Sequence, residues 1–231
     1  MNFDLRLGDC LDLMTDIADQ SVDMILADLP YAVTRNSWDE IIPLEPLWDH
    51  YRRIAKENAA IVLTSQQPFS SSLVASNPSM FRYSLVWQKT MPTGFLNANR
   101  MPLRSHEDIM VFYRRLPTYN PQKTQGHKPY RTQTGKRTSN YGHHTQTESV
   151  SSGERHPTSI LKFNHERGLH PTQKPVALME YLIRTYTDEG QTVLDNTVNR
   201  RANGTPDRRA KGTPFQGWQE GRGTRLAQRA A

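Results

Sequence analysis

The chain contains the segment Val22-Asp23-Met24-Ile25-Leu26-Ala27-Asp28-Leu29-Pro30-Tyr31, a near-continuous apolar run that ends abruptly in a polar and aromatic motif. Such a run is typical of a strand that is covered on both faces, as in a parallel sheet. Pro30 restricts its own backbone and has no N–H to donate, so the strand should end before it. We therefore expect residues 28–31 at the carboxyl end of a central strand.

Strand and helix patterns alternate on both sides of this segment. A short strand is predicted at residues 3–7 and a helix after the Gly8-Asp9 turn, and residues 46–58 show helical spacing before a buried strand at 59–64. Further strands are predicted at 81–89, 108–113 and 192–194, and further helices after Ser70 and around Leu178, Tyr181, Leu182 and Tyr186. This order indicates an α/β fold with a doubly wound, mostly parallel, Rossmann-like sheet, whose ligands bind beyond the carboxyl ends of the strands.

Composition separates the chain into parts. We expect residues 1–115 and 159–197 to form one main domain, interrupted at 116–158 by a polar and basic insertion with few apolar residues. Residues 198–231 form an atypical, arginine-rich tail that we expect to be irregular and poorly ordered, because its few apolar residues cannot bury much surface. The tail carries seven Arg and Lys211 against Asp207 and Glu220, which accounts for the whole net charge of +6.

Two observations bear on the location of the protein. The single cysteine, Cys10, excludes an internal disulfide, and the first residues lack the cationic and apolar regions of a signal peptide. No apolar run approaches the roughly 20 residues that span a bilayer. We expect a cytoplasmic protein without a membrane role.

The motif at residues 28–31 combines a carboxylate acceptor, a backbone restricted by proline, and an aromatic face, a set that suits a planar ring with an amine in its plane. The amine of a nucleobase is a poor nucleophile because its lone pair is delocalised into the ring. Asp28 and the carbonyl of Leu29 could accept its two N–H groups and favour a pyramidal nitrogen. The base would be flipped out of the duplex, with Tyr31 as its stacking platform. Standing alone, the motif would more often be an ordinary strand-to-loop turn.

The motif does not stand alone, and the chain resembles the permuted (β-type) DNA amino-methyltransferases from about residue 3 to residue 197. Residues 28–31 match the family's Asp-Pro-Pro-Tyr motif, with Leu29 as a variant, and Gly8-Asp9-Cys10 matches an early turn near the cofactor. Arg104-Ser105-His106-Glu107 resembles the segment that closes the wall of the base pocket. His170-Pro171-Thr172-Gln173-Lys174-Pro175 resembles the segment that packs over the cofactor, and Leu194-Asp195-Asn196-Thr197 the strand end before the family's glycine loop.

The resemblance implies a cofactor, S-adenosylmethionine, and a substrate, double-stranded DNA, with a monomer or a homodimer as the assembly. The catalytic residues would be Asp28, Leu29, Pro30 and Tyr31. The residues on the cofactor side would be Asp9, Cys10, Asp28, His170, Thr172, Lys174, Pro175, Asp195, Asn196 and Thr197. The candidate DNA contacts are Arg100, Arg104, His106, Lys123, Lys128, Arg131, Lys136 and Arg137, the last five in an insertion placed where the family has its target-recognition region.

Each of these assignments has a plainer alternative. Asp9 and Cys10 could form an ordinary turn, His106 and Glu107 a satisfied surface pair, and the insertion a solvated loop. The histidines of the insertion lack the spacing of metal ligands, so no metal is expected. The motif accommodates adenine or cytosine, and the resemblance favours adenine N6 over cytosine N4.

The sequence after Thr197 departs from the family pattern. A glycine-rich turn is expected there, because the cofactor approaches the backbone closely, but the chain continues Val198-Asn199-Arg200-Arg201-Ala202-Asn203-Gly204. Either an in-frame segment has decayed, or a change of reading frame near residue 198 has replaced the native end. The main alternative to an active enzyme is therefore a defective remnant that binds DNA without cofactor. A methyltransferase acting on RNA or small molecules shares the fold but is disfavoured by the match at residues 104–107 and the basic insertion.

Overall fold

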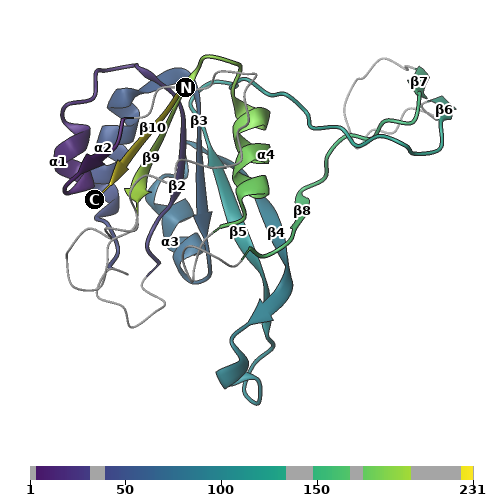
Figure 1. Ribbon diagram of the computed structural model, residues 1–231, viewed down its shortest axis with the longest axis horizontal. Helices are drawn as coiled ribbons and strands as arrows, with labels where there is room; N and C mark the ends of the chain where they lie inside the picture. Colours follow the sequence, from purple (N-terminus) through teal and green to yellow (C-terminus); the bar gives the residue numbers. More distant parts are fainter. Residues whose placement is uncertain (1–3, 32–39, 134–147, 167–173, 199–224, 231) are drawn as a thin grey trace. The chain divides into compact units, whose positions relative to one another are not determined.

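The computed structural model describes residues 4–31, 40–133, 148–166, 174–198 and 225–230, which belong to two compact units. The larger unit comprises Met1–Asn120 and Ser159–Ala231, and the smaller comprises Pro121–Thr158. Figure 1 shows the larger unit as a twisted sheet flanked by helices.

An eight-stranded sheet organises the larger unit, in the order β1-β10-β9-β2-β3-β5-β4-β8. The strands are β1 (Arg6–Leu7), β2 (Val22–Asp28), β3 (Ala55–Ser65), β4 (Phe81–Thr93), β5 (Arg104–Phe112), β8 (Ile160–Phe163), β9 (Thr192–Val198) and β10 (Arg225–Ala230). Neighbours are parallel from β1 through β3 and between β4 and β8, whereas β5 is antiparallel to both β3 and β4. The prediction of a mostly parallel α/β sheet is confirmed.

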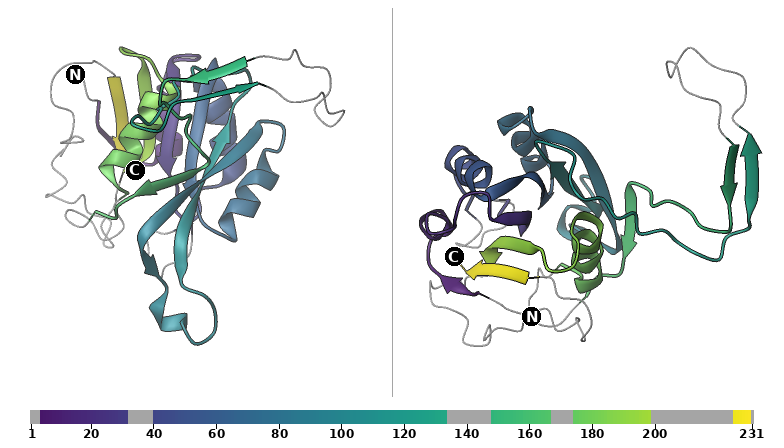
Figure 2. Two further views of the ribbon diagram at one scale, coloured as in Figure 1. Left: turned by 90° about the vertical axis from the view of Figure 1, so that its right-hand side faces the viewer. Right: turned by 90° about the horizontal axis from the view of Figure 1, so that it is seen from above.

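Helices cover both faces of this sheet, as the views in Figure 2 show. The helices are α1 (Cys10–Met14), α2 (Leu44–Ile54), α3 (Phe69–Ser76) and α4 (Val176–Tyr186), with a short 3₁₀ helix η1 (Phe95–Asn97). One core packs α1, α2 and α3 against the sheet, and a second packs α4 against the opposite face. Alternate residues of the central strands serve the two cores, so that Ile25 and Ile61 face one and Met24 and Val62 the other. This explains why these strands are apolar almost throughout.

The helix expected at residues 46–58 ends earlier, at Ile54. Ala55 already pairs with Val22, and β3 runs from there to Ser65. Pairing with the neighbouring strand outweighs the helical spacing of the side chains, because the sheet satisfies the backbone of the same residues.

The tail differs from the expectation of an irregular segment in its last part. Residues 225–230 form β10, which lies between β1 and β9 and is parallel to both. A strand in that position is held by backbone hydrogen bonds, which do not require the apolar side chains that the tail lacks. Residues 199–224 lie outside the described residues.

The smaller unit contains a two-stranded antiparallel ribbon of β6 (Tyr130–Gln133) and β7 (Glu148–Ser151). An isolated antiparallel bridge between Thr124 and Arg155 lies beyond the last pair of the ribbon, Tyr130 and Ser151. In the described part of the chain no helix is long and apolar enough to cross a membrane. Among the same residues no cluster of three or more His, Cys, Asp or Glu side chains could hold a metal ion.

Candidate active site

Four neighbouring strands bring one row of residues to the same edge of the sheet. Asp28 at the end of β2 pairs with Thr64 of β3, Thr64 pairs with Ile109 of β5, and Ile109 pairs with Leu85 of β4. Because β2, β3 and β4 run in the same direction, their carboxyl ends meet beyond this row. The motif at residues 28–31 therefore lies at the edge where α/β sheets bind ligands.

The carboxylate of Asp28 is held by donors from several segments. Its Oδ1 accepts hydrogen bonds from the hydroxyl of Tyr31 at 2.6 Å and from the hydroxyl of Thr64. Asp28 Oδ2 accepts a hydrogen bond from Lys174 Nζ at 2.8 Å. The backbone N–H of Asp28 donates to Thr197 Oγ1 at 3.1 Å. The Asp28 side chain is nevertheless 32% exposed. It is thus fixed in orientation while part of it stays open to a ligand.

A chain of buried charges leads from Asp28 into the sheet. Lys174 Nζ lies 2.8 Å from Asp28 Oδ1 and 3.2 Å from Glu107 Oε2, and Glu107 Oε1 lies 2.5 Å from Lys89 Nζ. The side chains of Lys89, Glu107 and Lys174 are 8%, 11% and 9% exposed. Burial opposes the charged form of Lys174, but the carboxylates of Asp28 and Glu107 outweigh it and raise the pKa of Lys174 above its usual value. Two cations and two anions alternate, so each buried charge has an opposite neighbour.

The ring of Tyr31 packs inside the same cluster. It stacks on Phe69 of α3 with ring centroids 5.7 Å apart and an interplanar angle of 29°, and Lys174 Nζ lies 5.4 Å from its centroid. Burial, followed by the negative charges of Asp28 and Glu107, raises the pKa of the Tyr31 hydroxyl well above its usual value. The hydroxyl therefore remains a proton donor to Asp28 across the physiological pH range.

The residues expected on the cofactor side lie beside this cluster at the ends of β9 and α1. Asp195 Oδ1 accepts from the backbone N–H and the hydroxyl of Thr197, both at 2.8 Å, and burial raises the pKa of Asp195 to about 6. Asn196 is fully buried, and its Oδ1 accepts from the hydroxyl of Tyr51 at 2.6 Å. Asp9 caps α1 by accepting from the N–H of Leu11, and burial raises the pKa of the Cys10 thiol.

Some of the residues expected on the cofactor side do not lie at the ends of β9 and α1. Lys174 contacts Asp28 and Glu107, so in this structure it serves the carboxylate cluster. Pro175 is buried and directly precedes α4. His170 and Thr172 lie outside the described residues.

The candidate DNA contacts fall into two groups. Arg100, Arg104 and His106 lie on the hairpin formed by β4 and β5, where Arg104 Nη1 donates to Gln66 Oε1 at 3.0 Å. His106 borders an open hollow of about 360 Å³ together with Val86, Gln88, Ser105 and Ile160.

The second group lies in the smaller unit. Lys123 is paired with Glu154 at 2.9 Å, which reduces the charge it can offer to a phosphate. Lys128 and Arg131 are exposed. Lys136 and Arg137 lie outside the described residues.

Four residues of the cluster were not among the expected site residues: Thr64, Phe69, Lys89 and Glu107. Thr64 could have been found, because it ends the buried strand next to the motif. Glu107 lies in the Arg104–Glu107 segment that resembles the wall of the base pocket, but the sequence did not indicate its ion pairs with Lys174 and Lys89. Lys89 could not have been found, since a charged residue in a strand cannot be told from ordinary exposed alternation until the strands are placed together. Phe69 belongs to a helix whose register against the motif depends on the fold.

Comparisons with protein families and with individual proteins both find DNA methyltransferases. The family model for DNA methylases of the N6 and N4 type matches residues 22–196. The type II methyltransferase M2.LlaDCHI of Lactococcus lactis subsp. cremoris is 26% identical over 223 residues, which cover 85% of this chain and 77% of that protein. The type II methyltransferase M2.MboI of Moraxella bovis is 23% identical over 224 residues, with 84% and 74% covered.

Solved structures of similar fold include a complex of M1.HpyAVI with S-adenosylmethionine and the cytosine-N4-specific PvuII DNA methyltransferase. The first has a TM-score of 0.57 at 18% identity and covers 100% of this chain and 94% of its own. The second has a TM-score of 0.58 at 12% identity and covers 84% of this chain and 74% of its own.

Proposed function

Because the chain belongs to the N6/N4 family of DNA methylases, we propose that it transfers a methyl group from S-adenosylmethionine to an exocyclic base amine in duplex DNA, with adenine N6 as the favoured target. The observation that carries the proposal is the Asp28 carboxylate, held by Tyr31, Thr64 and Lys174 yet partly open at the strand ends.

The residues beside Asp28 suit this cofactor. S-adenosylmethionine supplies an electrophilic methyl group on a sulfonium, and its methionine part also carries an ammonium. Asp28 and Asp195 place two carboxylates at adjacent strand ends, joined through Thr197, and carboxylates complement a ligand that carries positive charge. Burial raises the pKa of Asp195 to about 6, so most of this carboxylate is ionised at neutral pH.

Asp28 would act on the target amine. Its partly exposed carboxylate accepts a hydrogen bond from one N–H, and the carbonyl of Leu29 accepts from the other, which favours the pyramidal, nucleophilic nitrogen. The cofactor would supply the methyl group by breaking its sulfur–methyl bond and would leave as a neutral thioether. The amine nitrogen, cationic once methylated, would lose one proton to the Asp28 carboxylate and from there to solvent. Tyr31, Thr64 and Lys174 keep the carboxylate in place during both steps.

The target base would reach this pocket only after rotating out of the duplex, because the amine is otherwise paired and stacked. Tyr31, which packs on the buried ring of Phe69 next to Asp28, would be the stacking platform for the flipped base. The basic residues of the insertion would contact phosphates as a target-recognition region.

Transfer of a labelled methyl group to unmethylated genomic DNA tests the proposal without knowledge of the recognition sequence. Nucleoside analysis of the product separates N6-methyladenine from N4-methylcytosine. We expect label in adenine with the wild-type chain and none with Asp28→Ala. Methyl transfer that survives Asp28→Ala would refute the assigned role of Asp28, and label in cytosine would correct the target.

The sequence after Thr197 favours a second candidate, a remnant that binds DNA but not the cofactor, because the expected Gly-x-Gly turn is missing there. Calorimetry separates the two candidates: an enzyme binds S-adenosylmethionine, whereas a remnant binds DNA alone. A variant whose residues after Thr197 are replaced by a Gly-x-Gly loop and its following helix and strand should then gain cofactor binding. Translation of the gene in all three frames beyond codon 197 distinguishes a frame change from decay.

A further inference from the structure

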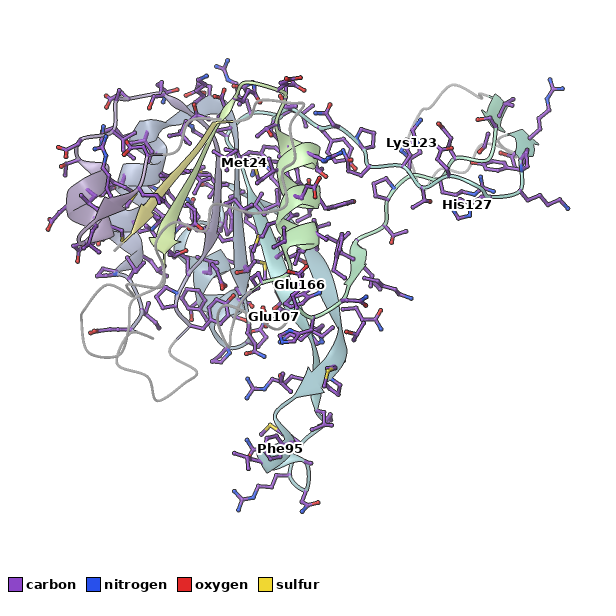
Figure 3. All side chains as sticks on the ribbon, in the orientation of Figure 1. Met24, Phe95, Glu107, Lys123, His127 and Glu166 are labelled. Carbon is purple, nitrogen blue, oxygen red and sulfur yellow. The ribbon has the colours of Figure 1, made fainter. Side chains whose placement is uncertain are left out.

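The hairpin of β4 and β5 extends well past the edge of the sheet that carries Asp28. The row of paired residues through Asp28 meets β4 at Leu85, and β4 continues from there to Thr93, which pairs with Arg104. The register of β4 shifts between Gln88 and Thr93, so the reach follows from the five residues of β5 between Ile109 and Arg104. At about 3.3 Å per residue, the paired part of the hairpin extends roughly 17 Å beyond the row. Figure 3 shows Glu107 near the base of this hairpin and Phe95 at its tip.

The tip has a defined backbone and an apolar surface. Gly94 adopts φ 89°, which side chains rarely tolerate, and starts the 3₁₀ turn of Phe95–Asn97. Hydrogen bonds from Asn97 to Gly94 and from Arg100 to Asn97 close the turn at 2.9 and 2.8 Å. Phe95 and Leu96 are 76% and 85% exposed, and Met91, Met101 and Leu103 are exposed behind them. The fold thus presents large apolar side chains to a partner.

The charge of the hairpin indicates what kind of partner this is. From Lys89 to His106 the chain has no acidic residue, and it includes Arg100 and Arg104. A second copy of the chain would bring an identical cationic hairpin against this one in a symmetric contact, which like-charge repulsion disfavours. The hairpin is cationic and has an apolar tip, so its partner should be a polyanion with an apolar interior. Duplex DNA has both, since its phosphates carry negative charge and its bases form an apolar stack.

We propose that the β4–β5 hairpin enters a groove of the DNA and inserts Phe95 and Leu96 into the base stack beside the target, filling the space that a flipped base leaves. A two-stranded ribbon fits the major groove, and Phe, Leu and Met are the side chains that proteins use as wedges between base steps. Arg100 and Arg104 lie behind the tip, where they contact phosphates. The inference rests on the proposed function, since it assigns a step that precedes methyl transfer at Asp28.

Binding of the full chain to two short duplexes tests this wedge. One duplex is fully paired, and the other has a central abasic site next to 2-aminopurine, whose fluorescence reports on stacking. A wedge fills the abasic gap, so we expect wild type to prefer the abasic duplex by about tenfold, the equivalent of 1.4 kcal/mol of stacking. Phe95→Ala/Leu96→Ala should abolish this preference and the change in fluorescence.

Two single variants supply a matched comparison. Leu96→Ala should reduce the preference, whereas Leu116→Ala, the same change at another highly exposed leucine, should leave it unchanged. An unchanged preference in the double variant would overturn the inference. So would a lack of preference in wild type, or a homodimer that Leu96→Ala dissociates without any effect on DNA binding.

The genomic methyl-transfer assay keeps this inference separate from the proposed function. Methyl transfer by a chain that shows no preference for the abasic duplex would refute the inserted wedge but not the proposed function. An abasic preference that depends on Phe95 and Leu96, without methyl transfer, would support the wedge and count against catalysis by this chain.

Discussion

The Asp28 carboxylate receives hydrogen bonds from residues that are far apart in the sequence: Tyr31 in its own motif, Thr64 at the end of β3 and Lys174 before α4. Because these donors approach both oxygens of the carboxylate from different segments, together they hold it in one orientation. Glu107 takes no part in these hydrogen bonds but shares Lys174 with Asp28 and also pairs with Lys89. We regard Glu107 as a positioning residue, because it acts on Asp28 through Lys174.

Glu107→Gln would leave Lys174 paired with Asp28 alone and would remove the carboxylate that pairs with the buried ammonium of Lys89. Breaking a buried ion pair by removing one partner costs about 3 to 5 kcal/mol, so we expect the free energy of unfolding to fall by that amount in urea titrations. Adding Lys89→Met should restore much of it by removing the unpaired charge. Glu154→Gln breaks the exposed pair with Lys123, which solvent screens, and should leave the free energy of unfolding nearly unchanged. Equal losses in Glu107→Gln and Glu154→Gln would contradict the buried network.

Asp195 makes a separate contribution that depends on pH. Burial raises its pKa to about 6 in the folded chain, above the value near 3.9 expected in the unfolded chain. The folded state therefore binds this proton more tightly, so the stabilisation is fully present below about pH 4 and is lost as the pH rises to about 6. At pH 7.5 the ionised carboxylate costs roughly 1 to 3 kcal/mol.

Asp195→Asn removes this ionisation and keeps an oxygen that can accept from Thr197. The variant should be more stable than wild type by roughly 1 to 3 kcal/mol at pH 7.5, and the difference should shrink towards pH 4. Urea titrations of both proteins across this range measure it. A difference that does not vary with pH would show that the burial of Asp195 does not raise its pKa.

Among the elements, β10 has the largest consequence for the sheet. It is the pairing partner of β1 and separates that strand from β9. β9 in turn carries Asp195, Asn196 and Thr197 near its end, so the strand that pairs with β10 also positions three of the residues that we expect on the cofactor side.

Deleting residues 225–231 should therefore weaken the sheet. Five register pairs to β9 are lost. With about one backbone hydrogen bond for each pair, at about 0.5 to 1.5 kcal/mol of net stabilisation, the free energy of unfolding should fall by roughly 2.5 to 7.5 kcal/mol. Amide exchange in β9 should become faster in the truncated chain. If the tail were irregular to its end, truncation would change neither measurement.

At the scale of the whole molecule, positive charge is unevenly distributed. Outside residues 198–231 the chain has 21 basic and 21 acidic residues, the remainder of the 29 and 23 in the whole chain, so its excess charge is concentrated in the tail. Charge of this kind favours binding to DNA whatever its sequence. We therefore expect the tail to add an affinity for DNA that can be separated from the contribution of the main domain.

Replacing Arg200, Arg201, Arg208 and Arg209 by Gln tests this separation. Each phosphate contact contributes about 0.9 to the slope of log affinity against log salt, so four contacts would reduce the slope by up to about 3.6. Titrations with mixed-sequence DNA at several salt concentrations give both slopes. The same slope in the variant would mean that these arginines do not contact DNA.

Much of the fold could be predicted because it depends on local patterns. The apolar runs at β2 and β3, the helical spacing at α4 and the alternation of strands and helices each follow from side chains that are neighbours in the sequence, and the sheet confirms them. The position of the motif at a strand end follows from the same patterns, since chain direction places Asp28 after the last buried residue of β2.

The partners of Asp28 and the reach of the hairpin depend on contacts that no local pattern contains. Lys174 meets Asp28 and Glu107 only when three strands and the segment before α4 are packed together, because separation along the chain carries no information about distance. Likewise, β10 pairs through backbone groups that every sequence possesses, so its place between β1 and β9 cannot be read from side chains. Local periodicity specifies elements, whereas burial of charges and pairing of distant backbones arise from their assembly.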